Sequence, residues 1–123
     1  LDKRLRERHA GAWQGLTRDE VEERFPGYLA EGRRPDDFEA AEVAGQRAGD
    51  CLVALARTIG TGTALAVSHG GILRALRHVC GLADEVTFPN LGGHWFEVIE
   101  DRLVGGEVVE LVSGDSPTLS APL

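Results

Sequence analysis

The sequence predicts an α/β fold, a three-layer sandwich around a mostly parallel sheet with an antiparallel edge. The apolar run at 64–67 is followed by two glycines and then by helical spacing, and strand, tight turn and helix form half of a βαβ unit. Near the C-terminus, HWFEVIE (94–100) and EVVELV (107–112) read as two strands separated by DRLVGG. Their proximity in sequence predicts an antiparallel pair at the sheet edge.

A first helix is predicted from the capping signals that follow residue 16. Thr17 is expected to cap the helix and to form a capping box with Glu20, three residues later. Leu16 is expected to pack on Val21 as a hydrophobic staple. A proline follows soon after Arg24, so the helix is expected to end there.

Two further helices are predicted from apolar stripes at helical spacing. The longer one covers 39–59 and is expected to end at Gly60, with a stripe of Ala41, Ala44, Ala48, Cys51, Leu52, Leu55, Ala56 and Ile59. The other follows the two glycines after the apolar run and ends at Gly81, with Ile72, Leu73, Leu76, Val79 and Cys80 on one side. Residues 26–37, rich in glycine, proline and charge, are expected to form a loop.

Composition narrows the possible partners of the chain. A net charge of −7 over 123 residues argues against binding nucleic acid through bulk charge, and no apolar run approaches the ~20 residues of a membrane span. The first residues lack the apolar centre of a signal peptide. Cys51 and Cys80 lie on apolar helical faces without a CxxC pattern, which predicts small buried side chains and a reducing, cytoplasmic setting.

The string SHGG at 68–71 is the first candidate site. Ligands of open α/β sheets bind beyond the carboxyl ends of strands, where His69 is predicted to lie. Gly70 and Gly71 would let a ligand approach the backbone at a helix N-terminus, which favours an anion such as phosphate. The alternative is that His69 merely caps the helix, and this string by itself leaves both interpretations open.

A second candidate string is LRERHAGAWQGLT at 5–17, and its presence before SHGG makes a functional interpretation of SHGG more specific. Together the two resemble the histidine phosphatase superfamily, the phosphoglycerate mutase-like family. The family pattern L-x-E-x-x-x-G-x-x-x-G-L followed later by S-H-G-G is matched by Leu5, Glu7, Gly11, Gly15, Leu16, Ser68, His69, Gly70 and Gly71. The resemblance spans residues 1 to about 112.

The resemblance implies a phosphomonoester hydrolase that forms a phosphohistidine. Glu7 would be the general acid and then the base, and His69 would stabilise charge on the transferring phosphoryl group. Gly70 and Arg8 would bind substrate, Arg8 through a carboxylate or second phosphate. Neither a metal nor a cofactor is implied, and the substrate would be a small phosphorylated metabolite. Without the resemblance, Glu7 would be interpreted as part of a surface salt bridge with Arg4 or Arg8.

Two elements of the family pattern are missing. The nucleophile there belongs to an R-H-G string, which this sequence lacks, and a second phosphate-binding arginine before the glutamate motif is absent as well. His9 is not expected to replace the nucleophile, and His78 and His94 are expected to be functionally neutral. With no methionine present either, we expect residues 1–123 to be a single partial domain that lacks its N-terminal strands and is inactive alone.

Counting back from Arg47, the glutamate of the family's Gly-Glu-Ser element would be Glu39.

Three functional alternatives remain. Glu7-Arg8-His9 is similar to the mutases, but Ala10 stands where they often have tyrosine, and Trp13 occupies a position where phosphatases often carry an aromatic. A phosphatase is therefore favoured over a mutase. A non-catalytic phosphate-binding module is the third alternative. A homo-oligomer paired through HWFEVIE is also considered, although a strand facing the core is the default.

Overall fold

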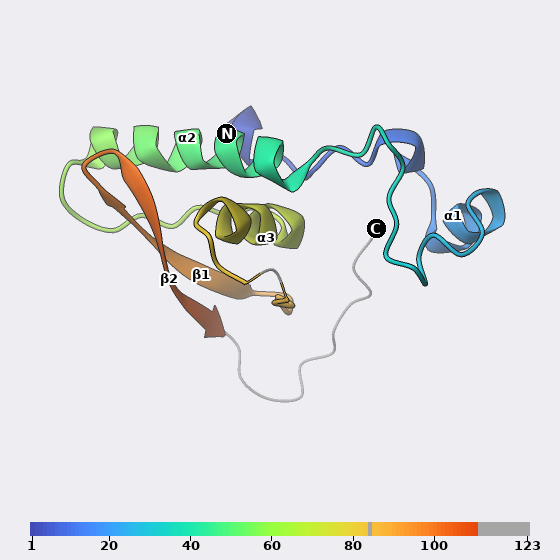
Figure 1. Ribbon diagram of the computed structural model, residues 1–123. Helices are drawn as coiled ribbons and strands as arrows, with labels where there is room; N and C mark the ends of the chain where they lie inside the picture. The colour runs from blue at the N-terminus through green and yellow to red at the C-terminus, as the bar shows by residue number, and fades with distance from the viewer. Residues whose placement is uncertain (84, 111–123) are drawn as a thin grey trace.

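The chain folds into a mixed arrangement of helices and strands (Figure 1). The computed structural model describes residues 1–83 and 85–110. Within these residues the elements are two short 3-10 helices, three α-helices and two strands: η1 (Lys3–Leu5), η2 (Gly11–Trp13), α1 (Arg18–Arg24), α2 (Ala41–Ile59), α3 (Gly70–Val79), β1 (Gly92–Ile99) and β2 (Arg102–Glu110). No described helix is long and apolar enough to cross a membrane.

The main core lies where α2 and α3 pack on each other and on the β hairpin (Figure 1). Its buried members are small or aliphatic: Ala44, Ala48, Ile72, Ala75 and Leu76, with Leu5, Leu52, Phe96 and Leu103 packed against them. The two helices approach closely at Gly45, where an added methyl group would overlap the carbonyl oxygen of Ala75. The apolar stripes predicted from the sequence therefore face each other, as amphipathic helices require.

The helix starts follow the local signals. In α1 the Thr17 hydroxyl accepts from the Glu20 amide at 3.3 Å and the Glu20 carboxylate accepts from the Thr17 amide at 2.8 Å, which confirms the capping box. α2 begins two residues later than predicted. The reason is that the backbone of Glu39 is bonded to the chain at His9 instead of to a helical turn.

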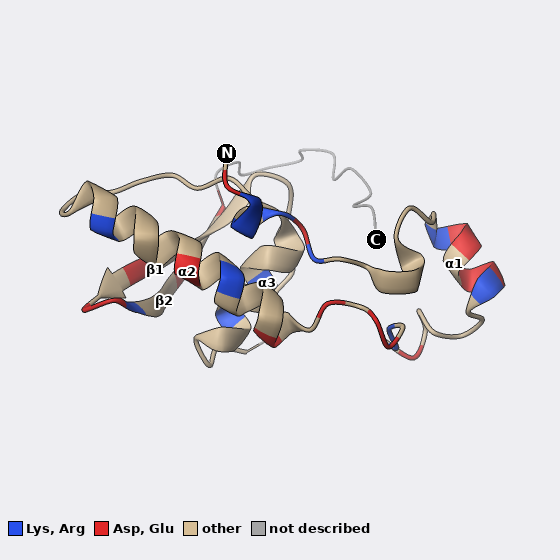
Figure 2. Ribbon diagram, turned by 90° about the horizontal axis from the view of Figure 1, so that it is seen from above, with Lys and Arg blue, Asp and Glu red and all other residues tan. Residues whose placement is uncertain are grey.

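A second, smaller cluster surrounds α1, apart from the main core (Figure 1). Ala10, Trp13 and Val21 are buried there, and Leu16, Phe25, Tyr28, Leu29 and Phe38 pack against them. Val21 is the buried residue of α1, whose other positions carry acidic and basic side chains (Figure 2). The irregular segments before η2 and before α2 link this part, here called the α1 lobe (residues 10–38), to the main core (Figure 1).

The strand predicted at 64–67 is not formed, and this prediction was wrong. The segment has no regular secondary structure, and Leu65 and Val67 are 82% and 81% exposed. A strand requires a hydrogen-bonded neighbour, and no described residue pairs with this segment. Among described residues the sheet has two strands, β1 and β2, and these are antiparallel. The predicted antiparallel edge is confirmed, while the predicted parallel sheet is not present in this part of the chain.

The hairpin turns earlier than predicted. Glu100 and Asp101 both have left-handed backbone angles, φ 50° and 61°, which is the conformation of a two-residue type I′ connection. Most of DRLVGG, expected to link the strands, therefore belongs to β2 itself. The last two residues of the predicted strand EVVELV lie outside the described residues. The register is irregular between His94 and Phe96.

Candidate active site

Glu7 lies between η1 and η2 on an irregular segment that crosses the N-terminal end of α3. A methyl group added at Gly71 would overlap the Glu7 carboxylate, whose Cδ atom would be 3.0 Å away. The same carboxylate accepts a hydrogen bond of 2.8 Å from the amide of Arg8. The structure thus brings the predicted acid of the first motif against Gly71 of the second, 64 positions later in the chain.

His69 is the N-cap residue of α3, with extended backbone angles. Its carbonyl oxygen accepts from the amides of Ile72 and Leu73, both at 3.0 Å, while its side chain makes no capping hydrogen bond. The imidazole is therefore not used to start the helix, and the side chain is exposed. Glu7 and His69 both lie at the end of α3 where the helix dipole favours negative charge.

Gly70 opens α3, and a methyl group there would be 3.6 Å from the Nη1 atom of Arg74. Arg74 therefore reaches back along the helix toward its N-terminus. Arg74 is not among the residues predicted from the sequence, although its i, i+4 spacing from Gly70 could have indicated it, since such positions share one helix face. A guanidinium beside a helix N-terminus strengthens the positive potential there.

Arg8 is held from two sides. Its Nε and Nη2 atoms donate to the carbonyl oxygen of Glu39 at 3.1 and 2.7 Å, and its guanidinium carbon lies 4.9 Å from the centre of the Phe38 ring. Burial lowers the pKa of Arg8, and the nearby positive charges of Arg34 and Arg74 lower it as well. A bound anion would reduce the repulsion among these three positive charges.

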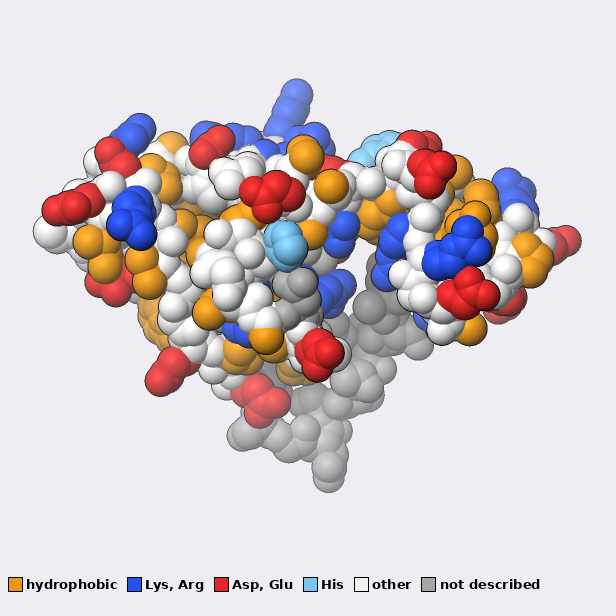
Figure 3. Space-filling model, in the orientation of Figure 1, with side chains coloured by type: hydrophobic (Ala, Val, Ile, Leu, Met, Phe, Trp, Pro, Cys, Tyr) orange, Lys and Arg blue, Asp and Glu red, His pale blue; other side chains and the backbone are white. Residues whose placement is uncertain are grey.

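Arg34, which sequence analysis also missed, comes from the α1 lobe and stacks 5.3 Å from the ring of Trp13. Arg8, Arg34 and Arg74, here called the arginine cluster, come from three parts of the chain, and the positive charges of Arg34 and Arg74 act on Arg8. Basic side chains are visible on both sides of the hollow between the main core and the α1 lobe (Figure 3). No local signal marks Arg34, because its place depends on how the lobe packs.

Glu39, which the family pattern suggested by counting back from Arg47, forms a close ion pair with Arg47. Arg47 Nε lies 2.7 Å from Glu39 Oε1, and the two side chains are only 13% and 12% exposed. The hydrogen bond from Arg47 lowers the pKa of Glu39 to about 2, against the opposing effect of burial. Glu39 thus pairs with the arginine from which it was counted, and neither a glycine nor a serine adjoins it in the sequence.

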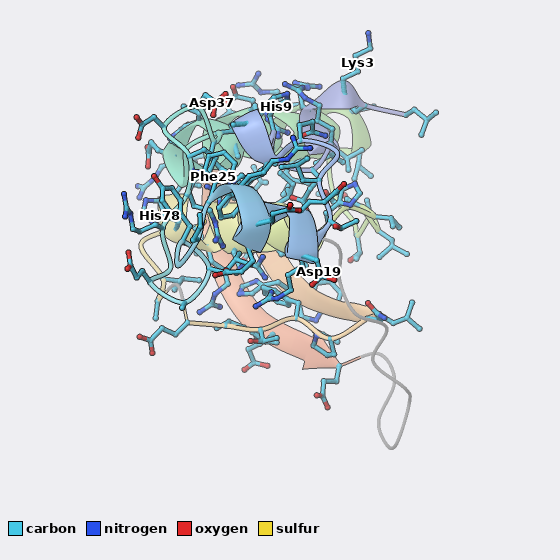
Figure 4. All side chains as sticks on the ribbon, turned by 90° about the vertical axis from the view of Figure 1, so that its right-hand side faces the viewer. Lys3, His9, Asp19, Phe25, Asp37 and His78 are labelled. Atoms are coloured by element: carbon cyan, nitrogen blue, oxygen red, sulfur yellow. The ribbon has the colours of Figure 1, made fainter. Side chains whose placement is uncertain are left out.

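The remaining histidines lie elsewhere. His9 is exposed, and its Nδ1 accepts from the Gly11 amide at 3.0 Å, so the ring is engaged locally. His78 projects from the molecule on another side (Figure 4), with Nε2 3.7 Å from a Glu42 carboxylate oxygen. His94, predicted to begin an edge strand, lies within β1 and contacts Arg77 at 2.8 Å.

Residues 1–83 and 85–110 contain no group of three His, Cys, Asp or Glu side chains that could hold a metal ion. The charged groups near the Glu7 segment are instead arginines and a carboxylate.

Comparison with known proteins identifies the family. Residues 1–98 match the family model described as the histidine phosphatase superfamily (branch 1), and this range includes Glu7, Arg8, His69 and Gly70. Neither the curated proteins nor the solved structures provide a match.

Proposed function

The chain belongs to the histidine phosphatase superfamily, whose chemistry is phosphoryl transfer, and we propose that it carries the acid–base half of a phosphomonoester hydrolase. The observation that supports this most directly is the position of the Glu7 carboxylate against Gly71, at the end of α3 that follows His69. An acid, an anion-binding helix end and nearby arginines are the groups that phosphoryl transfer requires.

In the proposed reaction a histidine attacks the phosphorus atom, and the bond from phosphorus to the ester oxygen breaks. Glu7 donates its proton to the leaving oxygen, which departs as an alcohol. Glu7, now a carboxylate, then takes a proton from water as the water oxygen attacks the phosphohistidine, which releases phosphate and restores the histidine. His69, the Gly70 amide and Arg8 stabilise the phosphoryl oxygens and bind the substrate.

The nucleophile in this proposal comes from polypeptide outside the 123 residues, because they contain no Arg-His-Gly string. The same polypeptide would supply strands beside 64–67 and complete a three-layer sandwich around a parallel sheet. The exposed Leu65 and Val67 side chains support this part of the proposal, since such a sheet would bury them. Residues 1–123 would then form one partial domain of a cytoplasmic enzyme and be inactive alone.

The test uses the protein expressed from its own gene. We expect it to release phosphate from small alkyl and aryl phosphomonoesters, and to yield acid-labile labelled phosphohistidine on rapid quenching with a ³²P-labelled substrate. Glu7→Gln should slow alkyl esters most, because an alkoxide needs protonation to leave. His69→Ala should slow both substrate types. His78→Ala, on another side of the molecule, is the matched control and should keep the wild-type rate.

Other outcomes distinguish the alternatives. Exchange between 2- and 3-phosphoglycerate without release of phosphate would show a mutase instead, for which Arg8 and the arginine cluster would hold the second anionic group. Binding of inorganic phosphate at the Gly70 amide without turnover of any ester would show a non-catalytic module, which the missing Arg-His-Gly string favours.

A further inference from the structure

The segment that carries Glu7 has little regular structure of its own. Between η1 and η2 it makes no helical turn and pairs with no strand, so its carbonyl groups need partners from elsewhere. An acid on such a segment would move freely unless other residues held the backbone on both sides of it.

Arg47, from α2, meets this need with one side chain. Its Nη1 donates to the carbonyl oxygens of Arg4 and Arg6 at 2.6 and 2.9 Å, and its Nη2 donates to that of Glu7 at 3.2 Å. The remaining N–H groups bind the Glu39 carboxylate, Nε at 2.7 Å and Nη2 at 2.9 Å. All five N–H groups of the guanidinium are therefore used.

Glu39 holds the other side of Glu7. Its Oε2 accepts from the His9 amide at 3.0 Å, its own amide donates to the His9 carbonyl at 2.9 Å, and its carbonyl accepts from the Arg8 side chain. The backbone is thus fixed before Glu7 by Arg47 and after it by Glu39. Because the two side chains also neutralise each other and are nearly buried, neither carries a free charge into the site.

We propose that Arg47 and Glu39 are positioning residues for Glu7, and that their pair, the Glu39–Arg47 clamp, holds the Glu7 carboxylate against the N-terminus of α3. The proposal rests on the proposed function for its catalytic meaning. Neither residue reaches the Gly70 end of the helix by any contact in the described residues, so both act through the backbone of residues 4–9. A lysine cannot replace Arg47, because it has three donors and no planar fork.

The first test needs no catalysis. In the intact protein, the chemical shift of the Gly71 amide is followed by NMR as the pH is varied. The part of the pH-dependent change that disappears in Glu7→Gln is the contribution of the Glu7 carboxylate. Arg47→Lys and the milder Glu39→Gln should reduce that contribution and speed hydrogen exchange at residues 5–9. The matched control is Arg57→Lys, whose partner Asp101 lies on the exposed surface, and it should change neither quantity. An unchanged Gly71 response in a folded Arg47→Lys protein would overturn the proposal.

The second test separates positioning from a general loss of structure. Arg47→Lys should lower kcat for an alkyl phosphate by up to about 100-fold, the effect of a misplaced catalytic group, with KM little changed. For p-nitrophenyl phosphate, whose leaving group departs without a proton, the decrease should be under about threefold. Equal losses for both substrates would show a merely structural role. If the wild-type protein turns over neither ester, the proposed function fails, and the Gly71 measurement still decides on the clamp.

Discussion

The hydroxyl of Ser68 donates a hydrogen bond of 2.6 Å to the carbonyl oxygen of Leu5. This single contact joins the residue before His69 to the segment that carries Glu7, across 63 positions of sequence. It links the two sequence motifs in addition to the contact of Glu7 with Gly71, and it holds the carbonyl of Leu5 between the two carbonyls, those of Arg4 and Arg6, that Arg47 binds.

We expect Ser68→Ala to lower the free energy of unfolding by about 0.5–1.5 kcal/mol, the usual contribution of a partly buried hydrogen bond. Urea unfolding monitored by circular dichroism measures this. Thr58→Ala is the matched control, because Thr58 donates at 3.1 Å to a carbonyl within its own exposed helix end. Equal effects of the two substitutions would show that the Ser68 bond contributes nothing beyond a local contact.

Gly45→Ala should destabilise the fold by about 1–3 kcal/mol, because the new methyl group would overlap the backbone of Ala75 and force α2 and α3 apart. One helical turn later, Gly49→Ala meets only Leu103 Cδ2 at 3.8 Å and should instead stabilise the helix by roughly 0.5–1 kcal/mol. Thermal unfolding of the two variants compares them directly. The prediction is wrong if both substitutions shift stability in the same direction.

Stability should fall on mild acidification because of His94. Burial lowers the pKa of His94 below its ordinary value of 6.5; the hydrogen bond with the Trp95 carbonyl raises it, and Arg77 lowers it further. His94 then binds a proton more readily in the unfolded chain than in the folded one. The contribution of neutral His94 to the free energy of unfolding is therefore complete above pH 6.5 and is lost as the pH falls below that value.

Unfolding between pH 7.5 and 5 checks this, since the carboxylate of Glu39 titrates far below that range. His94→Gln retains an oxygen that can accept from Arg77 and should flatten the dependence over the same interval. A slope that is identical in the variant and the wild type would assign the effect to other groups.

Leu65→Ser and Val67→Ser should change the unfolding free energy of residues 1–123 by no more than about 0.5 kcal/mol, because both side chains are exposed. By contrast, Ile72→Ala should cost about 2–5 kcal/mol, since Ile72 is fully buried in the main core. Denaturant titration of the three variants is sufficient. A large loss from either serine would indicate that the segment is packed, as the sequence predicted.

Local signals determined much of the fold. The capping box at Thr17 and Glu20, the stripe of α2 and the helix after Gly70 could be predicted because each depends on residues within a turn or two of one another. The run at 64–67 carries the same kind of apolar signal, but a strand forms only beside another strand. Its prediction failed because the partner is not among the described residues.

For the candidate site, the sequence by itself determined the two motifs, their order and their membership of the histidine phosphatase superfamily. Only the tertiary structure decided that Glu7 meets Gly71, that Arg34 and Arg74 lie near Arg8, and that one guanidinium holds three carbonyls. These contacts join residues tens of positions apart. Their geometry follows from how α2, α3 and the α1 lobe pack, and packing is a property of the whole chain that no short stretch of it encodes.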